Sequence, residues 1–160
     1  MEQEILVGTP SGPCVGAESS ESVLCFANIP YARAERWQQP EPLPASQNLL
    51  NTRDFGFAPL QEPLNPFFAA MRGDAPSVPG SEDCLNLNIW VNEKGPRKKA
   101  VLLWIYGGSY IHGYNYQNYV RPDALVRAHP ELLVAACNYR LGLFASLNLS
   151  ALDPEGSCRY

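Results

Sequence analysis

The sequence has little of what nucleic-acid-binding or membrane-spanning proteins require. Its net charge is −4, and its densest basic cluster is Arg97–Lys99, beside a Gly-Pro pair, a pattern typical of a solvated turn. No apolar run approaches the roughly 18–20 residues that cross a bilayer. The first ten residues contain two acidic residues and no long apolar stretch. We therefore expect no nucleic-acid partner, no membrane span and no secretory signal.

Cysteine and histidine are also scarce, and their spacing does not match the common metal-binding patterns. The five cysteines form no C-x-x-C pair, and they show no metal-ligand spacing with the two histidines, His112 and His129. Their number is odd, and nothing in their pattern demands an oxidising compartment. The sequence implies no metal and no organic cofactor.

Proline, by contrast, is abundant, with 15 prolines in 160 residues. Most lie between Pro30 and Pro79, and proline lacks the N–H group that helices and sheet ladders need. We expect long surface loops in that region. The chain is long enough for one domain with a hydrophobic core.

Strands are predicted on both sides of this loop region. Residues 4–8 and 22–28 have the composition of short strands around a Gly/Ser-rich turn. Residues 83–92 alternate strictly, with leucine, isoleucine and valine on one face and Asn86, Asn88 and Trp90 on the other. This period of two predicts a half-buried strand.

The second half of the chain predicts a βαβ unit. Residues 100–106 are apolar without alternation, which suits a strand buried on both faces. A short helix is expected from about 120 to 129, with Pro122 in its first turn and Asp123 favoured by its dipole. A second apolar run follows at 131–139. The pattern indicates a crossover between parallel strands, and hence an α/β fold.

Two glycines stand where the first of these strands ends. Ligands in open α/β sheets bind beyond the carboxyl ends of the strands, and Gly107 and Gly108 follow such an end. Consecutive bare amides can form an anion-binding nest, so this segment is a candidate site for developing negative charge. A glycine-rich turn without a ligand remains an open alternative.

Five segments resemble the type-B carboxylesterase and cholinesterase family, in the family's order. WIYGGSYIHG resembles its oxyanion-hole segment, W-I-[HY]-G-G-G-[FY]-x-x-G, and SEDCLNLNIW resembles its second signature. Asn28, Asn86, Ser109, Ala145 and Ser146 depart from the usual residues. The matched segments are Phe26–Ala32 (FANIPYA), Arg36–Leu43 (RWQQPEPL), Ser81–Trp90, Trp104–Gly113 and Asn138–Leu147 (NYRLGLFASL).

The resemblance implies an α/β-hydrolase fold and a carboxylic ester hydrolase acting on a small-molecule ester. Residues 1–160 would be the N-terminal segment of that domain, a mixed sheet whose antiparallel strands lead into parallel ones. The amides of Gly108 and Ser109 would hold the oxyanion, with Gly107 shaping the turn. If position 109 requires a positive φ, Ser109 adds strain of about 1–3 kcal/mol.

The family's catalytic triad finds no match in these 160 residues. Its nucleophile lies in G-x-S-x-G, whereas Gly8–Gly12 (GTPSG) places the serine one position too late. No nucleophile is identified for His112 or His129 to activate. We expect the isolated chain to be inactive. Two other readings stay open: a non-catalytic cholinesterase-like binding domain, and a truncated gene product without a function of its own.

Further family positions imply structural roles. Arg36 and Glu82 match residues that form a buried ion pair, and Asp83, Asn138 and Arg140 are likewise expected to be structural. Cys84 matches a cysteine that in many members pairs with one upstream, but Phe55–Gln61 (FGFAPLQ) lacks that partner. The missing disulfide favours a reducing setting, and we predict a cytoplasmic protein.

Overall fold

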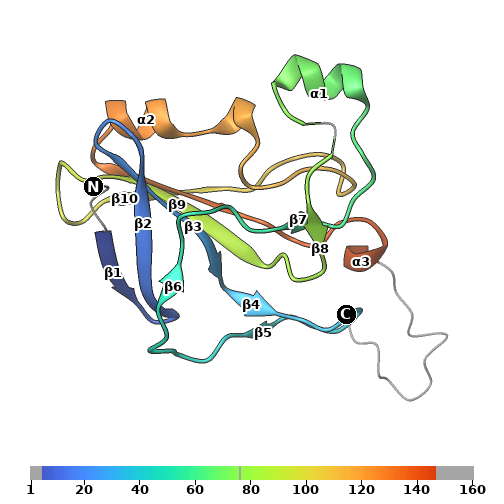
Figure 1. Ribbon diagram of the computed structural model, residues 1–160, viewed down its shortest axis with the longest axis horizontal. Coiled ribbons are helices and arrows are strands. Elements are labelled where there is room, and N and C mark those ends of the chain that lie inside the picture. The colour runs from blue at the N-terminus through green and yellow to red at the C-terminus, as the bar shows by residue number, and fades with distance from the viewer. Residues whose placement is uncertain (1–4, 76, 147–160) are drawn as a thin grey trace.

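The computed structural model describes residues 5–75 and 77–146, and its centre is a mixed sheet (Figure 1). The strands follow the order β1-β2-β3-β9-β11-β10, and β6 pairs with β2 off this path. β10 and β11 are parallel, whereas β1, β2, β3, β9 and β11 form successive antiparallel pairs. Their bounds are β1 (Ile5–Thr9), β2 (Gly12–Ser20), β3 (Val23–Pro30), β6 (Leu50–Asn51), β9 (Asn86–Asn92), β10 (Ala100–Trp104) and β11 (Leu132–Cys137).

The Gly/Ser-rich stretch between the first two predicted strands is itself a strand, so the prediction of a turn was wrong. β2 pairs with β1 on one side and β3 on the other. A glycine is needed at position 16 because the ring of Phe26 packs against the main chain there. A Cβ atom added to Gly16 would come within 2.7 Å of that ring. The composition reflects close packing rather than a turn.

β9 is buried on both faces, not on one as expected. Its apolar side chains, among them Leu87 and Ile89, pack against a cluster that includes Leu24 and Phe26. The opposite face, which carries Asn86, Asn88, Trp90 and Asn92, is the more buried of the two. Trp90 packs with Val23, Val126 and Val134 in a second cluster. The central strand therefore contacts two hydrophobic layers.

The βαβ prediction is confirmed. α2 (Asp123–Ala128) links the parallel strands β10 and β11, and in Figure 1 it lies above the sheet, with β6 and β5 below. Pro122 is the residue before the helix rather than part of its first turn. A short 3₁₀ turn, η1 (Asn118–Val120), precedes it.

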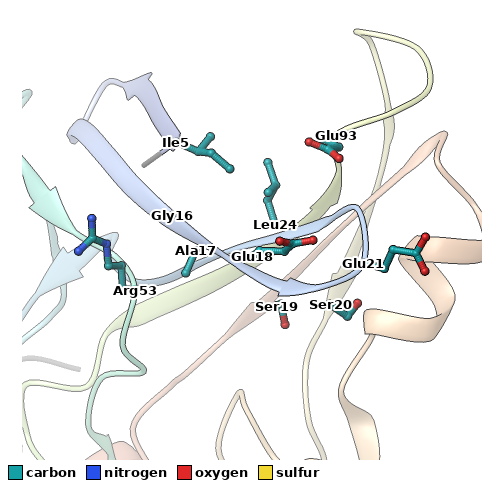
Figure 2. Close-up of a pocket in the computed structure, with 10 residues that line it drawn as sticks. All are labelled: Ile5, Gly16, Ala17, Glu18, Ser19, Ser20, Glu21, Leu24, Arg53 and Glu93. Atoms are coloured by element: carbon teal, nitrogen blue, oxygen red, sulfur yellow. The ribbon is translucent and has the colours of Figure 1, made fainter. Parts of the chain in front are cut away.

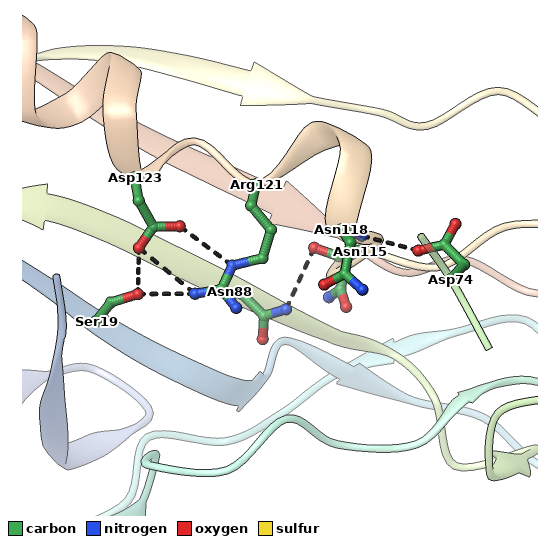
Figure 3. A network of polar contacts seen from close by, with 7 residues as sticks. All are labelled: Ser19, Asp74, Asn88, Asn115, Asn118, Arg121 and Asp123. Atoms are coloured by element: carbon green, nitrogen blue, oxygen red, sulfur yellow. Dashed lines mark hydrogen bonds and ion pairs between the residues drawn. The ribbon is translucent and has the colours of Figure 1, made fainter. Parts of the chain in front are cut away.

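Polar contacts join the start of α2 to the antiparallel part of the sheet (Figure 3). Arg121 contacts Asp123 with 3.1 Å between Nε and Oδ2, and its Nη2 donates to Ser19 Oγ at 2.9 Å. The Ser19 hydroxyl also donates to Asp123. These contacts attach the crossover helix to the end of β2.

β10 does not have the predicted burial on two faces. All five of its residues are exposed; Val101 keeps 67% of its surface and Leu103 57%. The reason is its position: β10 ends the sheet, and within residues 5–75 and 77–146 it pairs only with β11. An apolar sequence suits burial on both faces but does not supply the neighbours that would cover them.

Residues 31–85 contain short elements joined by loops. Among them is a helix that the sequence did not predict, α1 (Pro66–Arg72), whose first turn is capped by the Asn65 side chain and whose end is marked by Gly73 at φ +67°. None of the described helices is long and apolar enough to cross a membrane. The remaining elements are β4 (Ala32–Arg33), β5 (Glu41–Pro42), β7 (Ala58–Pro59), β8 (Gly80–Ser81) and, after β11, α3 (Leu143–Ser146).

Candidate functional site

The segment Gly107–Gly113, here called the glycine loop, follows the carboxyl end of β10. It turns back on itself: the amides of Ile111 and His112 both donate to the carbonyl oxygen of Gly108, at 3.0 and 3.1 Å. Gly108 has a φ of +139°, and Ser109 and Tyr110 have left-handed values of +57° and +58°. Position 109 thus adopts the conformation that disfavours a side chain, and Ser109 carries the associated strain of about 1–3 kcal/mol.

The first amides of the glycine loop have no protein partner. Among the residues that the structure describes, no hydrogen bond is donated by the main-chain nitrogens of Gly107, Gly108 and Ser109. All three residues are exposed. Successive N–H groups in such a turn can converge on one acceptor. The loop can therefore receive a negatively charged oxygen.

The two glycines differ in why glycine is needed. A Cβ atom at Gly108 would lie 1.8 Å from the carbonyl oxygen of His112, so any side chain there would disrupt the turn. A Cβ atom at Gly107 would meet nothing within 4 Å. Gly108 is required by the fold of the loop, whereas Gly107 leaves room beside it.

The turn after β11, Tyr139–Gly142, holds the glycine loop on both sides. The Tyr139 hydroxyl donates to the carbonyl oxygen of Tyr106 at 2.6 Å, and the rings of these two tyrosines stack with centroids 4.5 Å apart. On the other side, the Gly142 amide donates to the carbonyl oxygen of Tyr110 at 2.7 Å. Burial raises the pKa of the Tyr139 hydroxyl above its usual value.

Gln61 fixes the far end of the glycine loop, and sequence reasoning missed it. Its side-chain oxygen accepts from the Gly113 amide and its side-chain nitrogen donates to the Gly113 carbonyl, both at 2.9 Å. The residue lies in the proline-rich region, where its only sequence signal was its place in the segment Phe55–Gln61.

A network of buried asparagines connects β9, β11 and the chain after the glycine loop. Asn138 accepts a hydrogen bond from the Asn115 amide at 2.8 Å and donates to Asn86 at 3.3 Å and to the Phe57 carbonyl at 3.2 Å. Asn115 donates to Asn86 at 3.1 Å, and Asn88 donates to the Asn115 carbonyl (Figure 3). The alternation of asparagine with leucine, which had suggested a half-buried strand, instead marks a hydrogen-bonded polar core, in which the Asn115 side-chain oxygen is the atom left without a partner.

Arg36 and Glu82 form the predicted ion pair, but the pair is not buried. Arg36 Nε lies 2.9 and 3.0 Å from the two carboxylate oxygens of Glu82, while the side chains remain 56% and 30% exposed. Both residues lie in the loop region, where solvent reaches them. The Arg36 hydrogen bond lowers the pKa of Glu82. An exposed pair of this kind adds little to stability.

The other two charged residues of this set are not paired with each other in the structure. Asp83 is exposed, and its amide donates to Ser81 Oγ at 3.1 Å. Arg140 is half-buried, and its Nη1 atom is buried without a hydrogen-bond partner. Its charge lowers the pKa of Glu82, though less than Arg36 does.

Within residues 5–75 and 77–146, neither histidine has a hydrogen bond to a serine or cysteine side chain. The His112 ring nitrogen Nδ1 is buried without a hydrogen-bond partner. The ring of His129 pairs with Glu131 at 3.1 Å on the surface. The described cysteines, Cys14, Cys25, Cys84 and Cys137, are free thiols. Burial raises the pKa of Cys25 to about 12 and that of Cys84 to about 11, so both are poor nucleophiles at neutral pH.

Hollows of about 570 and 480 Å³ lie beside Arg33 and Glu35, away from the residues of the glycine loop. A cavity of about 420 Å³ beside β2 is lined by Glu18, Glu21, Glu93 and Arg53, among others (Figure 2). Within the described chain, no group of three or more histidine, cysteine or acidic residues is placed to hold a metal ion. The free amides of the glycine loop remain the strongest candidate site.

Comparison with known proteins identifies the family of the chain. A model of the carboxylesterase family matches residues 3–156. An acetylcholinesterase of Leptinotarsa decemlineata is 30% identical over 175 residues, covering 96% of this chain and 28% of that protein. A juvenile hormone esterase of Tribolium castaneum is 32% identical over 158 residues, and the match covers 92% of this chain and 25% of that esterase.

Solved structures give the same result. A thermophilic pNB esterase superposes with a TM-score of 0.78 at 25% identity, over 95% of this chain and 31% of the esterase. A carboxylesterase of Geobacillus stearothermophilus gives a TM-score of 0.74 at 30% identity, over 96% of this chain and 30% of that enzyme. The chain thus spans less than a third of the relatives it matches.

Proposed function

This chain belongs to the carboxylesterase family, and we propose that it supplies the oxyanion-binding loop of a serine-dependent carboxylic ester hydrolase. The observation that carries the proposal is the set of free amides at Gly107–Ser109, beyond the carboxyl end of a parallel strand. The α/β-hydrolase fold of the structural relatives supports it. The substrate class is a small-molecule ester.

In the proposed reaction, a serine attacks the ester carbonyl and the carbonyl oxygen becomes an oxyanion. The amides of Gly108 and Ser109 donate to that oxygen, and Gly107 leaves space for it beside the turn. Tyr139, Gly142 and Gln61 hold the loop before the reaction starts, so little reorganisation is needed as charge develops. One such donor contributes about 10²–10³ in kcat.

Ser109 is compatible with this role because a serine keeps its main-chain N–H. Its φ of +57° is a value that a glycine adopts freely and that a serine adopts at the cost of strain. The attacking serine has no match in the 160 residues, which contain no G-x-S-x-G. We therefore propose that the isolated chain does not turn over esters. Its location in the cytoplasm stays a prediction.

A non-catalytic, cholinesterase-like binding domain is the second candidate. The observation in its favour is the strained Ser109 in place of the family's third glycine. In that case the loop would keep its shape without supporting catalysis. The two candidates differ in whether the glycine loop can work when a complete catalytic triad is supplied.

A chimera separates them. Residues 5–146 would replace the matched segment of the Geobacillus stearothermophilus carboxylesterase, and p-nitrophenyl ester hydrolysis would be measured. We expect an active enzyme in which Gly108→Ala lowers kcat by about 10²–10³. Gly8→Ala, on β1 at the opposite end of the sheet, is the matched control because a Cβ atom there meets nothing within 4 Å; it should have a much smaller effect. A folded chimera that is inactive, or that is indifferent to Gly108→Ala, would favour the binding domain.

A further inference from the structure

Ser109 differs from the other residues that have a left-handed backbone. Five residues other than glycine have a positive φ, namely Ser22, Asn28, Trp37, Ser109 and Tyr110. Four of them make contacts in which that conformation is held, whereas Ser109 has no hydrogen bond, ion pair or ring contact with any described residue. It is also exposed. Strained positions of this kind cluster at functional sites.

The contacts of the other four residues account for their conformations within the fold. They join the Ser22 amide to Glu18 (3.3 Å), the Asn28 amide to Asn88 Oδ1 (2.8 Å), the Tyr110 carbonyl to the Gly142 amide (2.7 Å) and the Trp37 ring to the Arg36 guanidinium (5.8 Å). At position 109 a glycine would adopt the same φ without strain. The fold of the described chain therefore gives no reason for a side chain there, and a role in chemistry would account for it.

A serine at this position adds a hydroxyl donor beside a main-chain donor. Only two carbon atoms separate the nitrogen and the Oγ of one serine, so in a gauche rotamer both atoms can donate to a single acceptor. The hydroxyl hydrogen rotates to meet that acceptor, and hydroxyl groups make short, strong hydrogen bonds to charged oxygens. The preceding amide, that of Gly108, is free as well.

We propose that the Ser109 hydroxyl is a further donor to the oxyanion, beside the amides of Gly108 and Ser109. This inference rests on the proposed function and adds a side chain to its machinery. The attacking serine forms the bond to the carbonyl carbon, and the π electrons of the carbonyl move to its oxygen. Ser109 donates a hydrogen bond to that oxygen and keeps its own proton. The hydroxyl thus offsets, in the transition state, the strain that the side chain imposes on the loop.

Two substitutions of Ser109 in the chimera test the proposal with p-nitrophenyl esters. Ser109→Ala removes the hydroxyl and keeps the strain, whereas Ser109→Gly removes both. We expect each variant to lower kcat by about tenfold or more with little change in KM, because the donor acts on charge that develops in the transition state. A rise in kcat in Ser109→Gly would show that the side chain is only a burden on the loop. That result, or an unchanged kcat in Ser109→Ala, would overturn the inference.

Ser22→Ala is the matched control for these variants. Ser22 is also a serine in the left-handed region, with φ +60°, but it lies in the turn between β2 and β3, and its substitution should leave kcat unchanged. An active chimera that loses activity in Gly108→Ala but not in Ser109→Ala would overturn this inference and leave the proposed function standing. A folded but inactive chimera would overturn the proposed function, and this inference with it.

Phosphonate binding to the 160-residue chain provides a second measurement that does not need the chimera. An alkyl phosphonate monoester is a stable tetrahedral anion, and its binding can be followed at the Gly108 amide by nuclear magnetic resonance. We expect the dissociation constant to rise by about tenfold in Ser109→Ala and in Ser109→Gly, and to stay unchanged in Ser22→Ala. Equal affinities of Ser109→Ala and the parent chain would overturn the role of the hydroxyl.

Discussion

β9 and β10 reverse the usual relation between polarity and burial. β9 contains three asparagines among its seven residues, yet every second residue is buried. β10 is entirely apolar, yet all of it is exposed. The difference lies in position, because β9 has a strand on each side and layers on both faces, whereas β10 ends the sheet. Burial in this chain is set by neighbours and by satisfied hydrogen bonds more than by side-chain hydrophobicity.

The largest effect is expected from breaking the asparagine network at Asn138. Asn138→Ala would leave the buried Asn115 amide without its partner and would remove one of the two hydrogen bonds to the Phe57 carbonyl and to the Asn86 side-chain oxygen. One unsatisfied buried amide and two lost hydrogen bonds destabilise a protein by about 2–5 kcal/mol in total. Urea unfolding measures the loss. Asn48→Ala, at an exposed position, should change stability by less than about 0.5 kcal/mol.

Substituting one valine on each strand compares the buried strand β11 with the exposed strand β10 directly. Val134 on β11 is 3% exposed, whereas Val101 on β10 is 67% exposed. Val134→Ala should lower the free energy of unfolding by about 1.5–3 kcal/mol, and Val101→Ala by less than about 0.5 kcal/mol. Urea denaturation of the two variants and the parent chain provides the measurement. Equal losses at the two sites would show that β10 is covered.

Tyr139→Phe tests how the buried part of the molecule holds the exposed glycine loop. The substitution keeps the ring stacked on Tyr106 and removes the hydroxyl that donates to the Tyr106 carbonyl. We expect a loss of about 0.5–1.5 kcal/mol and faster hydrogen exchange at the Gly142 amide. Unchanged exchange at Gly142 would mean that this hydroxyl does not hold the loop.

The smallest effect concerns the exposed ion pair. The Arg36 hydrogen bond keeps the pKa of Glu82 below its usual value. A depressed carboxyl pKa stabilises the folded chain above the unfolded-state pKa, and this contribution is lost as the pH falls through the folded-state value. Urea midpoints from neutral to acidic pH should therefore fall less steeply in Glu82→Gln. An identical acid slope in the variant would contradict this assignment.

Local sequence patterns predicted the helices and strands better than they predicted which neighbours cover them. Two apolar runs separated by a helix signal predicted the crossover helix and the parallel strand pair. The glycines at the end of the first run predicted the position of the loop. The exposure of β10 could not follow, because a continuous apolar run does not identify its neighbours. β2 was missed because Gly16 serves the packing of Phe26, and the role of Asn86 depends on partners that are distant in sequence. Family resemblance identified Arg36 and Glu82 as partners but not their exposure.

The central claim is that the free amides of the glycine loop bind a tetrahedral oxyanion. Its most direct test is a nuclear magnetic resonance titration of the ¹⁵N-labelled chain with an alkyl phosphonate monoester, a stable tetrahedral anion. We predict saturable shifts of the Gly108 and Ser109 amide resonances and their loss in Gly108→Ala. No shift at these two amides in the folded chain, or the same shifts in Gly108→Ala, would contradict the claim.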